Sequence, residues 1–578
     1  MVARYFIILC AVSWTAVAAI ASTQQRSVVV VGGGVGGVVT AGLLAASPDK
    51  PEVLLLEKGS RLGGRMQSDV VQSATHPGHT YRFDTGPSLL LMPDIYRQTF
   101  GALGGDLADH VDLVPVEGPQ YRVFFQGDVG GAMSEAIDIS RDDAVMRQSL
   151  ETLVPGEGDS LLRKYKKYLR IASDFLAFGF GAVIAERPDF STLPAFLMAC
   201  LRVWPLQSHL SMLRGIFGSD DRYKRVHALF SFQDLYIGLA PQETPAVFSL
   251  LQALEFEKGI YYPRGGFGQV ARGLADLARQ RGVQVRLGTE CLGLQMSSMG
   301  PGGRVEGVHV GSSSSSGGGV GSAATSILCN AVVVNIDAPR AEELFLPPAV
   351  QDRGAITKRP SCGIVSLSFA LNITLSRLAH HTLFLGDMGE CWECVKRPDG
   401  STFDGEKFNF YVHAPSRSDP STCPDGHDAI TVLVPVPPLP LAAAGAAEGE
   451  AAQAQEEALV REVRVAVMRR LEEMSQLAPG TLAGYVVAEL ARTPLTWRAE
   501  VGLFRGQAFG LAHNLLQLSL LRPRLRHPRV GNLFRVGAST RPGNGVPLVM
   551  EGARLTAEAV ARGFEMQREE ESKNILGV

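Results

Sequence analysis

The sequence has almost no net charge and few cysteines for its length. Its 55 basic and 58 acidic side chains in 578 residues give a formal net charge of −3, and the lack of a strongly basic stretch argues against a nucleic-acid partner. The eight cysteines are scattered and form no disulfide framework. Cys391 and Cys394 make a single C-x-x-C without a second pair at zinc spacing, so we interpret them as ordinary loop cysteines and predict no metal site.

The length of the chain predicts two or more domains. Hydrophobic residues make up 46% of it, which fits a large core, an apolar substrate or contact with a membrane. Residues 1–26 differ from the rest: an apolar run follows Arg4, and Ala19-Ile20-Ala21 precedes a polar stretch. This arrangement is typical of a signal peptide, with an uncleaved membrane anchor as the alternative. In both cases the segment lies outside the fold.

The most informative stretch begins with four consecutive valines at 28–31, which predict a buried parallel strand. Gly32, Gly34 and Gly37 follow with the spacing G-x-G-x-x-G, and Val35 lies within it. This spacing allows a tight turn, a close approach to a pyrophosphate and close packing of a helix predicted over 38–46. A second apolar strand, 53–56, ends at Glu57, where a carboxylate can bind ribose hydroxyls. The order of these parts predicts a dinucleotide site.

The residues after Glu57 distinguish between dinucleotides. Lys58 opens a short basic loop that ends in Gly63-Gly64-Arg65. An acid, a basic loop and G-G-R together resemble the second half of the FAD fingerprint of the large flavoprotein oxidase and desaturase superfamily. The resemblance implies that Lys58, Gly64 and Arg65 contact FAD, with the planar Arg65 guanidinium at the phosphate and ribityl portion.

Further segments resemble one branch of that superfamily, the bacterial- and fungal-type carotenoid (phytoene) desaturases. Phe83-Asp84-Thr85-Gly86-Pro87-Ser88 is similar to the family's F-D-x-G-P-S segment, which implies that Gly86, Pro87 and Ser88 lie beside the flavin. Residues 232–266 and 419–437 resemble two other family stretches. Residues 532–547, ending in Pro542-Gly543-Asn544-Gly545-Val546-Pro547, resemble the closing flavin motif almost throughout. The similarity extends from about residue 27 to residue 562.

The closing motif is also interpretable from its residues. Residues 533–536 form a predicted strand, Gly537 and Ala538 allow backbone to approach a ligand, and Gly545 precedes a helix that starts at Val546-Pro547. The N-terminus of such a helix would stabilise the anionic reduced flavin at its N1 and O2 edge. The motif contains no cysteine, so we predict that FAD is bound non-covalently.

Other segments complete the nucleotide domain. We predict an amphipathic helix over 267–281 and strands over 283–287 and 331–337. The resemblance places Cys291 where a residue contacts adenine through its main chain. A Ser/Gly-rich insertion, 311–324, and an Ala/Glu-rich insertion, 441–456, interrupt the pattern, and the second is predicted to lead into a helix that runs to residue 477.

The predicted fold class is α/β, with a discontinuous Rossmann-like FAD-binding domain and an inserted mixed α+β substrate domain. The FAD-binding parts are 27–110, 249–340 and 502–565, the substrate parts are 111–248 and 341–501, and residues 566–578 are a charged tail. Large apolar residues crowd 175–217, with arginines between them. This segment is either a tunnel lining with a lid that inserts into a membrane or a set of ordinary core helices.

The resemblance implies an FAD-dependent carotenoid desaturase. Its substrate is a hydrophobic polyene at a membrane surface, and its electron acceptor is oxygen or a quinone. A hydride would leave an allylic carbon for flavin N5, so no strong general base is demanded. His513, Arg541 and Glu551 lie near the flavin motifs, but we assign them no catalytic role.

Two alternatives stay open: a carotene cis–trans isomerase that uses reduced FAD, and a carotenoid-binding protein that keeps FAD as a structural element. We expect the chain to be membrane-associated and routed by its N-terminal segment, to a plastid if the source is photosynthetic. The sequence indicates no particular oligomeric state.

Overall fold

The computed structural model describes residues 26–126, 135–183, 193–298, 300, 302–312, 325–386, 388–397, 402–440, 450–518 and 521–576. The signal-like segment, most of the Ser/Gly-rich insertion and the first half of the Ala/Glu-rich insertion lie outside these residues. Predictions about them therefore stay predictions.

Parallel strands from three distant parts of the chain form the nucleotide sheet. Its order is β19-β13-β1-β2-β9, and all neighbours are parallel. β-branched and leucine residues dominate these strands, as expected for a sheet covered on both faces. The strands are β1 (Ser27–Val31), β2 (Glu52–Leu56), β9 (Gln284–Arg286), β13 (Ala331–Val334) and β19 (Leu533–Arg535).

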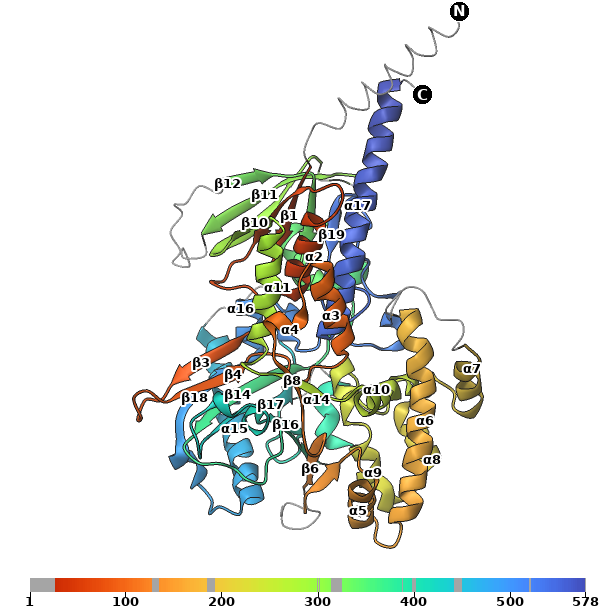
Figure 1. The fold of residues 1–578 in the computed structure, drawn as a ribbon, viewed down its shortest axis with the longest axis vertical. Helices are drawn as coiled ribbons and strands as arrows, with labels where there is room; N and C mark the ends of the chain where they lie inside the picture. Colours follow the sequence, from red (N-terminus) through yellow and green to blue (C-terminus); the bar gives the residue numbers. More distant parts are fainter. Residues whose placement is uncertain are drawn as a thin grey trace, which may run out of the picture.

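Alternate residues of β1 face two different cores. Val28 and Val30 pack with the helical layer, whereas Val29 and Val31 pack against a small antiparallel sheet. The helical layer contains α2 (Val35–Ala45), α3 (Pro93–Ala102), α4 (Leu107–His110), α11 (Gly268–Gln280) and α17 (Val546–Leu576). The antiparallel sheet contains β10 (Thr289–Met296), β11 (Val305–Ser312) and β12 (Thr325–Leu328). Figure 1 shows both layers in the upper half of the molecule.

A seven-stranded sheet forms the centre of the inserted domain, in the order β18-β14-β17-β16-β15-β6-β7. All its pairs are antiparallel except β15 with β6. The strands are β6 (Tyr121–Phe125), β7 (Ile137–Ile139), β14 (Gly363–Leu371), β15 (His381–Leu385), β16 (Phe410–His413), β17 (Asp428–Val436) and β18 (Val486–Arg492).

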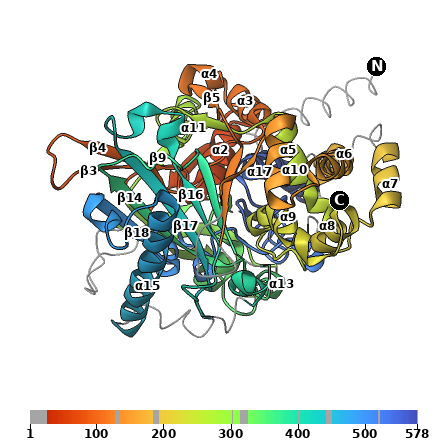
Figure 2. The same ribbon diagram turned by 90° about the horizontal axis from the view of Figure 1, so that it is seen from below.

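Helices cover both faces of this sheet (Figures 1 and 2). One apolar core contains residues of α15 (Glu450–Ser475), and another joins the sheet to a helical group. That group comprises α5 (Asp143–Leu153), α6 (Gly158–Val183), α7 (Leu193–Arg202), α8 (His209–Phe217), α9 (Lys224–Leu229) and α10 (Leu250–Lys258).

Short elements connect the two domains. Two ribbons are formed by β3 (Ser68–Gln72) with β4 (Thr80–Asp84), and by β5 (Leu113–Pro115) with β8 (Tyr261–Pro263). The remaining helices are α12 (Ala338–Phe345), α13 (Arg353–Ile356), α14 (Glu393–Lys396) and α16 (Pro494–Val501).

The predicted α/β class with an inserted domain is confirmed, and the packing places several elements differently from the predicted boundaries. α10 packs on α6 through Ala253 and Leu254, so it belongs to the inserted domain and not to the nucleotide part predicted to begin at 249. α12 contributes Ala341 to the core under β1, so the nucleotide part extends past 340. α15 begins inside the predicted 441–456 insertion, and α17 continues through most of the predicted charged tail.

The described residues of the apolar segment 175–217 include both buried and exposed large side chains. Phe175, Leu213 and Phe217 are fully buried core residues. In contrast, α7 and the turn after it expose large apolar side chains, with Leu201 80% and Trp204 62% exposed. Among the described residues, no helix has both the length and the apolar character needed to cross a membrane.

A buried ion pair ties β19 to α12. Arg535 is 1% exposed, and its guanidinium donates to Glu342 and, at 3.0 Å, to Asp352. His527 lies 3.3 Å from the same Glu342 carboxylate. Burial alone would raise the pKa of Glu342, but His527 and Arg535 together lower it. The charges therefore compensate one another inside the core.

Removing Arg535 should destabilise the whole nucleotide domain. An Arg535→Ala chain would keep Glu342 buried without its main partner, which costs about 3–5 kcal/mol. We expect a clearly lower thermal unfolding midpoint. Arg526→Ala is the matched control, because Arg526 lies in the loop before β19 and is exposed. An equal loss in both variants would contradict this assignment.

Candidate functional site: a dinucleotide cradle closed by both ends of the chain

The turn after β1 is packed too closely for side chains. Gly32 has a φ of +100°, and a Cβ atom there would lie 2.9 Å from the main-chain oxygen of Asn335. A Cβ on Gly34 would lie 2.8 Å from Asn335 Nδ2, and one on Gly37 would lie 2.0 Å from the oxygen of Gly32. The predicted glycine fingerprint is thus a steric requirement of the fold.

Glu57 sits at the end of β2 beside this turn. Its Oε2 accepts from the Gly33 amide at 2.7 Å, and its Oε1 accepts from the Gly59 amide at 2.6 Å. These contacts orient the carboxylate at the carboxyl edge of the sheet, where a ribose is bound in folds of this kind. Thr289, at the start of β10, donates its amide to the main-chain oxygen of Glu57 at 3.0 Å.

The G-G-R segment lies against both the turn and the G-P-S segment. Gly34 and Gly63 form a parallel bridge, and a Cβ on Gly64 would approach the Cα of Gly34 to 3.1 Å. A Cβ on Gly86 would meet the main-chain oxygen of Arg65 at 2.5 Å. The Thr85 hydroxyl donates to that same oxygen at 2.9 Å. Segments that are twenty residues apart are therefore held as one wall.

Arg65 connects this wall to the C-terminal part of the chain. Its Nη1 donates to the main-chain oxygen of Ala508 at 2.7 Å. Burial lowers the pKa of Arg65, and the nearby Asp337 opposes that shift. Asp337 in turn accepts from the Phe504 amide at 3.0 Å. A buried, fixed guanidinium at this place suits a phosphate or ribityl group.

The closing motif completes the cradle from the opposite end of the chain. The Val536 amide donates to Val334 at 3.0 Å, extending the sheet, and Gly537 follows with a φ of +131°. Arg522 Nη2 donates to the oxygen of Ala538 at 2.8 Å. Gly545 has a φ of +97° and leads into α17, whose first residues are Val546 and Pro547.

These features fit a bound FAD. No side chain caps the N-terminus of α2, which contains Val35, and neither α2 nor α17 has an acidic residue in its first turn. Two helix N-termini with available positive potential therefore point toward the glycine cradle. The residues that would hold the cofactor are Gly32, Gly34, Val35, Gly37, Glu57, Gly64, Arg65, Gly86, Pro87, Ser88, Gly537, Ala538, Gly545, Val546 and Pro547.

Two predicted cofactor residues take less direct positions. The Lys58 ammonium donates to the main-chain oxygen of Ala499 in α16, so it binds protein backbone. Cys291 is buried at the start of β10 and pairs with Val310. Burial raises the pKa of the Cys291 thiol to about 11, so the side chain is neutral and only its backbone suits an adenine contact. Both assignments stay predictions.

The three polar residues near the flavin motifs have structural partners. His513 is buried, its amide donates to Ile237 at 3.0 Å, and burial holds its pKa well below the usual range. Glu551 pairs with Arg554 at 2.6 Å within α17. Arg541 precedes Pro542 in a cis peptide bond. None of these contacts indicates a catalytic role.

Sequence reasoning missed Asn335 as a site residue. Its Nδ2 donates to the oxygen of Gly32 at 3.2 Å, and its Oδ1 lies 3.4 Å from the place of a Cβ on Gly537. The side chain thus hydrogen-bonds the first flavin motif and borders the space that a side chain at Gly537 would need. The available signal was its position directly after the buried strand β13, at the sheet edge where ligands bind.

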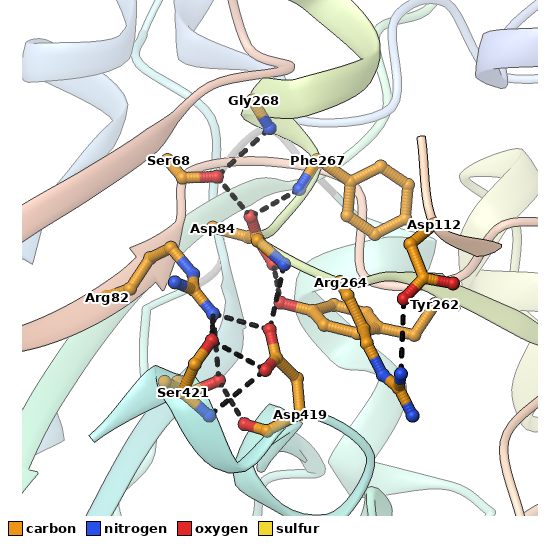
Figure 3. A network of polar contacts seen from close by, with 12 residues as sticks. Ser68, Arg82, Asp84, Asp112, Tyr262, Arg264, Phe267, Gly268, Asp419 and Ser421 are labelled. Atoms are coloured by element: carbon orange, nitrogen blue, oxygen red, sulfur yellow. Dashed lines mark hydrogen bonds and ion pairs between the residues drawn. The ribbon is translucent and has the colours of Figure 1, made fainter. Parts of the chain in front are cut away.

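A second missed feature is the buried carboxylate of Asp84 (Figure 3). Its Oδ1 accepts from Ser68 at 2.6 Å and from the Phe267 amide at 2.8 Å, and its Oδ2 accepts from the Tyr262 hydroxyl at 2.7 Å. Burial raises the pKa of Asp84 in spite of these donors. The network joins β4 to the start of α11 and fixes the G-P-S segment that follows Asp84.

Comparisons with known proteins agree with this site. The family model of the flavin containing amine oxidoreductases matches residues 35–563. A phytoene desaturase of Neurospora crassa is 31% identical over 542 residues, which covers 90% of this chain and 82% of that protein. A zeta-carotene-forming phytoene desaturase of Myxococcus xanthus is 30% identical, over 88% of this chain and 89% of that protein.

Solved structures share the fold at low sequence identity. A putrescine oxidase bound to putrescine has a TM-score of 0.54 at 16% identity, covering 93% of this chain and 99% of its own. An oxidoreductase of Methanosarcina mazei has a TM-score of 0.53 at 13% identity, covering 92% of this chain and 100% of its own. These likenesses show the fold alone.

The fold and the cradle together define a flavoprotein oxidoreductase. The family-model match and the similarity to relatives over most of their length identify the family more closely. The chain belongs to the flavin containing amine oxidoreductase family, on the phytoene desaturase branch. Among the described residues, no group of three or more His, Cys, Asp or Glu side chains is arranged to hold a metal ion.

Adding a methyl group to Gly37 should weaken flavin binding. The Gly37→Ala chain must separate α2 from the turn, and overpacking of this size costs about 1–3 kcal/mol. We expect roughly ten- to hundred-fold weaker FAD binding, measured by titrating the apoprotein and following flavin fluorescence. Gly101→Ala is the control, because no atom lies within 4 Å of that Cβ. Unchanged FAD affinity in Gly37→Ala would contradict the cradle.

Proposed function

We propose that this protein is an FAD-dependent carotenoid desaturase that introduces carbon–carbon double bonds into a linear polyene. The observation that carries the proposal is a single flavin cradle built by both ends of a chain that resembles phytoene desaturases over nearly its whole length. When bound, the flavin supplies a two-electron acceptor for the hydride that leaves the substrate.

The chain itself supplies binding, orientation and exclusion of water. A polyene has no charged group, so its affinity must come from burial of hydrocarbon, at about 0.8 kcal/mol per CH₂. Aromatic rings lie next to the flavin segments: Tyr236 is 6.3 Å from Phe509 and from Phe232 between ring centroids. Such rings suit a flat conjugated chain and leave little room for water.

We also propose that FAD is held non-covalently and that oxygen or a quinone reoxidises it. The closing motif, residues 532–547, contains no cysteine. The isomerase interpretation would need the same cradle with flavin reduced in advance, and no feature of the site favours it.

Membrane docking through α7 is a further part of the proposal. A polyene resides in the bilayer, and α7 with the following turn exposes large apolar residues, which is the pattern of a segment that inserts into one leaflet. These residues are Leu197, Met198, Leu201, Trp204 and Leu206. We propose that the protein associates with a membrane at this surface. We also propose that the N-terminal segment directs the chain to that membrane, in a plastid if the source is photosynthetic.

Mixing the oxidised holoenzyme with phytoene in detergent or liposomes, without oxygen, should bleach the flavin absorbance. The bleaching follows because hydride transfer reduces the ring as the double bond forms, and pigment analysis should then show a longer polyene. An isomerase would leave oxidised flavin unchanged and act only after prior reduction. That result would reject the desaturase.

Replacing the exposed apolar residues of α7 should weaken binding to membranes. We expect the Leu201→Ser/Trp204→Ser double variant to float less with phosphatidylcholine vesicles, because each buried apolar side chain contributes about 1.5–3 kcal/mol. Val465→Ser is the matched control, since Val465 is 67% exposed on α15. Equal flotation of all three proteins would contradict docking through α7.

A further inference from the structure

A buried carboxyl group on α10 stands beside the aromatic residues of the inserted domain. Glu255 is 4% exposed. Its Oε1 accepts from the Tyr121 hydroxyl at 2.9 Å, and its Oε2 accepts from Gln233 Nε2 at 2.6 Å. In the described part of the chain, no Lys, Arg or His side chain pairs with it. Two neutral donors therefore hold this carboxyl group.

Its environment is unusual for a purely structural carboxyl group. Burial raises the pKa of Glu255 to about 8, although Tyr121 and Gln233 oppose that shift. The group can thus change charge near neutral pH, and burying such a group without a cation is costly. Gln233 Oε1 and Gln252 Nε2 nearby are also buried without a hydrogen-bond partner. Polar groups of this kind gather at functional sites.

Two tyrosines lie between Glu255 and the flavin segments. The Tyr121 and Tyr236 side chains interact electrostatically with each other. The main-chain oxygen of Tyr236 accepts from Asn544 Nδ2, in the closing flavin motif, at 2.5 Å. On the opposite wall the Tyr411 side chain, which hydrogen-bonds His381 at 2.7 Å, interacts with Ser88 of the G-P-S segment. Tyr236 therefore lies between the carboxyl group and the cofactor cradle.

The other side of Glu255 lies close to solvent. Gln120 Nε2 donates to the main-chain oxygen of Glu255 at 2.8 Å. Gln120 also lines a surface hollow of about 120 Å³, together with Arg141 and Ile260. The backbone of Glu255 is thus one side chain away from an opening to water.

We propose that Glu255 receives the proton released when the polyene is desaturated, through Tyr236 and Tyr121. This inference rests on the proposed function. Loss of a hydride leaves a delocalised carbocation on the substrate, and loss of a proton from the neighbouring carbon forms the double bond. That proton passes to the Tyr236 oxygen, the Tyr236 proton to Tyr121, and the Tyr121 proton to the ionised Glu255 carboxylate.

The step balances: the substrate loses one hydride and one proton, the cofactor takes the hydride, and Glu255 becomes neutral. A carbocation is a strong acid, so weakly basic phenol oxygens suffice as carriers. The carboxylate is needed because a positive charge left in an apolar chamber has a high free energy. Glu255 acts through the tyrosines and is a positioning residue in this scheme.

The test is the pH profile of substrate-dependent flavin bleaching in the holoenzyme. The wild-type rate should rise with pH, reach half its maximum near pH 8, where Glu255 is half ionised, and level off above that pH. Glu255→Gln keeps the size of the side chain but cannot accept a proton. It should be at least about 10²-fold slower and show no such rise. Glu255→Asp should partly restore the rate and the profile, and Tyr236→Phe should be as slow as Glu255→Gln.

Glu257→Gln is the matched control, because Glu257 lies on the same helix and is exposed. A wild-type rise that persists in Glu255→Gln would overturn the inference. If the wild-type enzyme bleaches with phytoene but its rate is independent of pH, the inference also fails while the desaturase stands. If the wild-type enzyme never bleaches, the proposed function itself fails.

Two readouts do not depend on turnover. The infrared band of a protonated carboxyl group should disappear near pH 8 in the resting wild-type protein and be absent from Glu255→Gln. Because the folded pKa lies above the unfolded one, the contribution of Glu255 to stability is complete below about pH 4.5 and is lost as the pH rises toward 8. The thermal midpoint of wild type minus Glu255→Gln should fall over that range.

Discussion

Three stretches of backbone meet where the turn after β1, the end of β13 and the turn after β19 approach one another, and the space between them excludes Cβ atoms. Asn335 lies at the centre: its oxygen stands 2.9 Å from the place of a Cβ on Gly32, and its Oδ1 stands 2.7 Å from that of Gly36. Side chains here would separate the strands from the helices that must present their N-termini to the phosphates. The cradle can form only because the residues of the turn after β1 carry no side chains at these positions.

The inserted domain is under a different constraint. Its substrate, a polyene, has no polar groups, yet it must be bound close to a charged cofactor. Its cores are apolar, and two buried carboxyl groups in and beside it have neutral partners. Asp84 and Glu255 are both held mainly by hydroxyl and amide donors. Hydrogen bonds fix the positions of both carboxyl groups. The flavin performs the oxidation, and the chain controls geometry and the fate of the proton.

A small network of buried polar contacts also holds the junction of the two domains together. The Asp84 network holds β4, β8 and the start of α11 together, and the adjacent Arg82–Asp419 pair at 2.5 Å extends it to the inserted domain. Burial alone would raise the pKa of Asp419, but the Gly265 amide, Ser421 and Arg82 together lower it. Figure 3 shows this polar network, which links the inserted domain to β4, just before the G-P-S segment.

Local patterns made much of the nucleotide half predictable. Four consecutive valines, a glycine triad and an acid at the end of the next strand have one low-energy arrangement, and the predicted strands at 28–31, 53–56 and 533–536 agree with the structure within a residue or two. Boundaries in the inserted half were less predictable. The apolar residues of α10 and α12 suit either domain, and only packing on α6 or under β1 decides between them.

The sequence by itself determined the cofactor class and the fold that presents it, because steric demands on glycine and burial of strand residues are local. Tertiary structure alone decided which polar side chains meet. Asn335 hydrogen-bonds Gly32 across 303 positions, and Glu255 is joined to Tyr121 across 134 positions. No periodicity encodes such pairs, because the free energy of a buried carboxyl group depends on neighbours that the chain brings together only by folding.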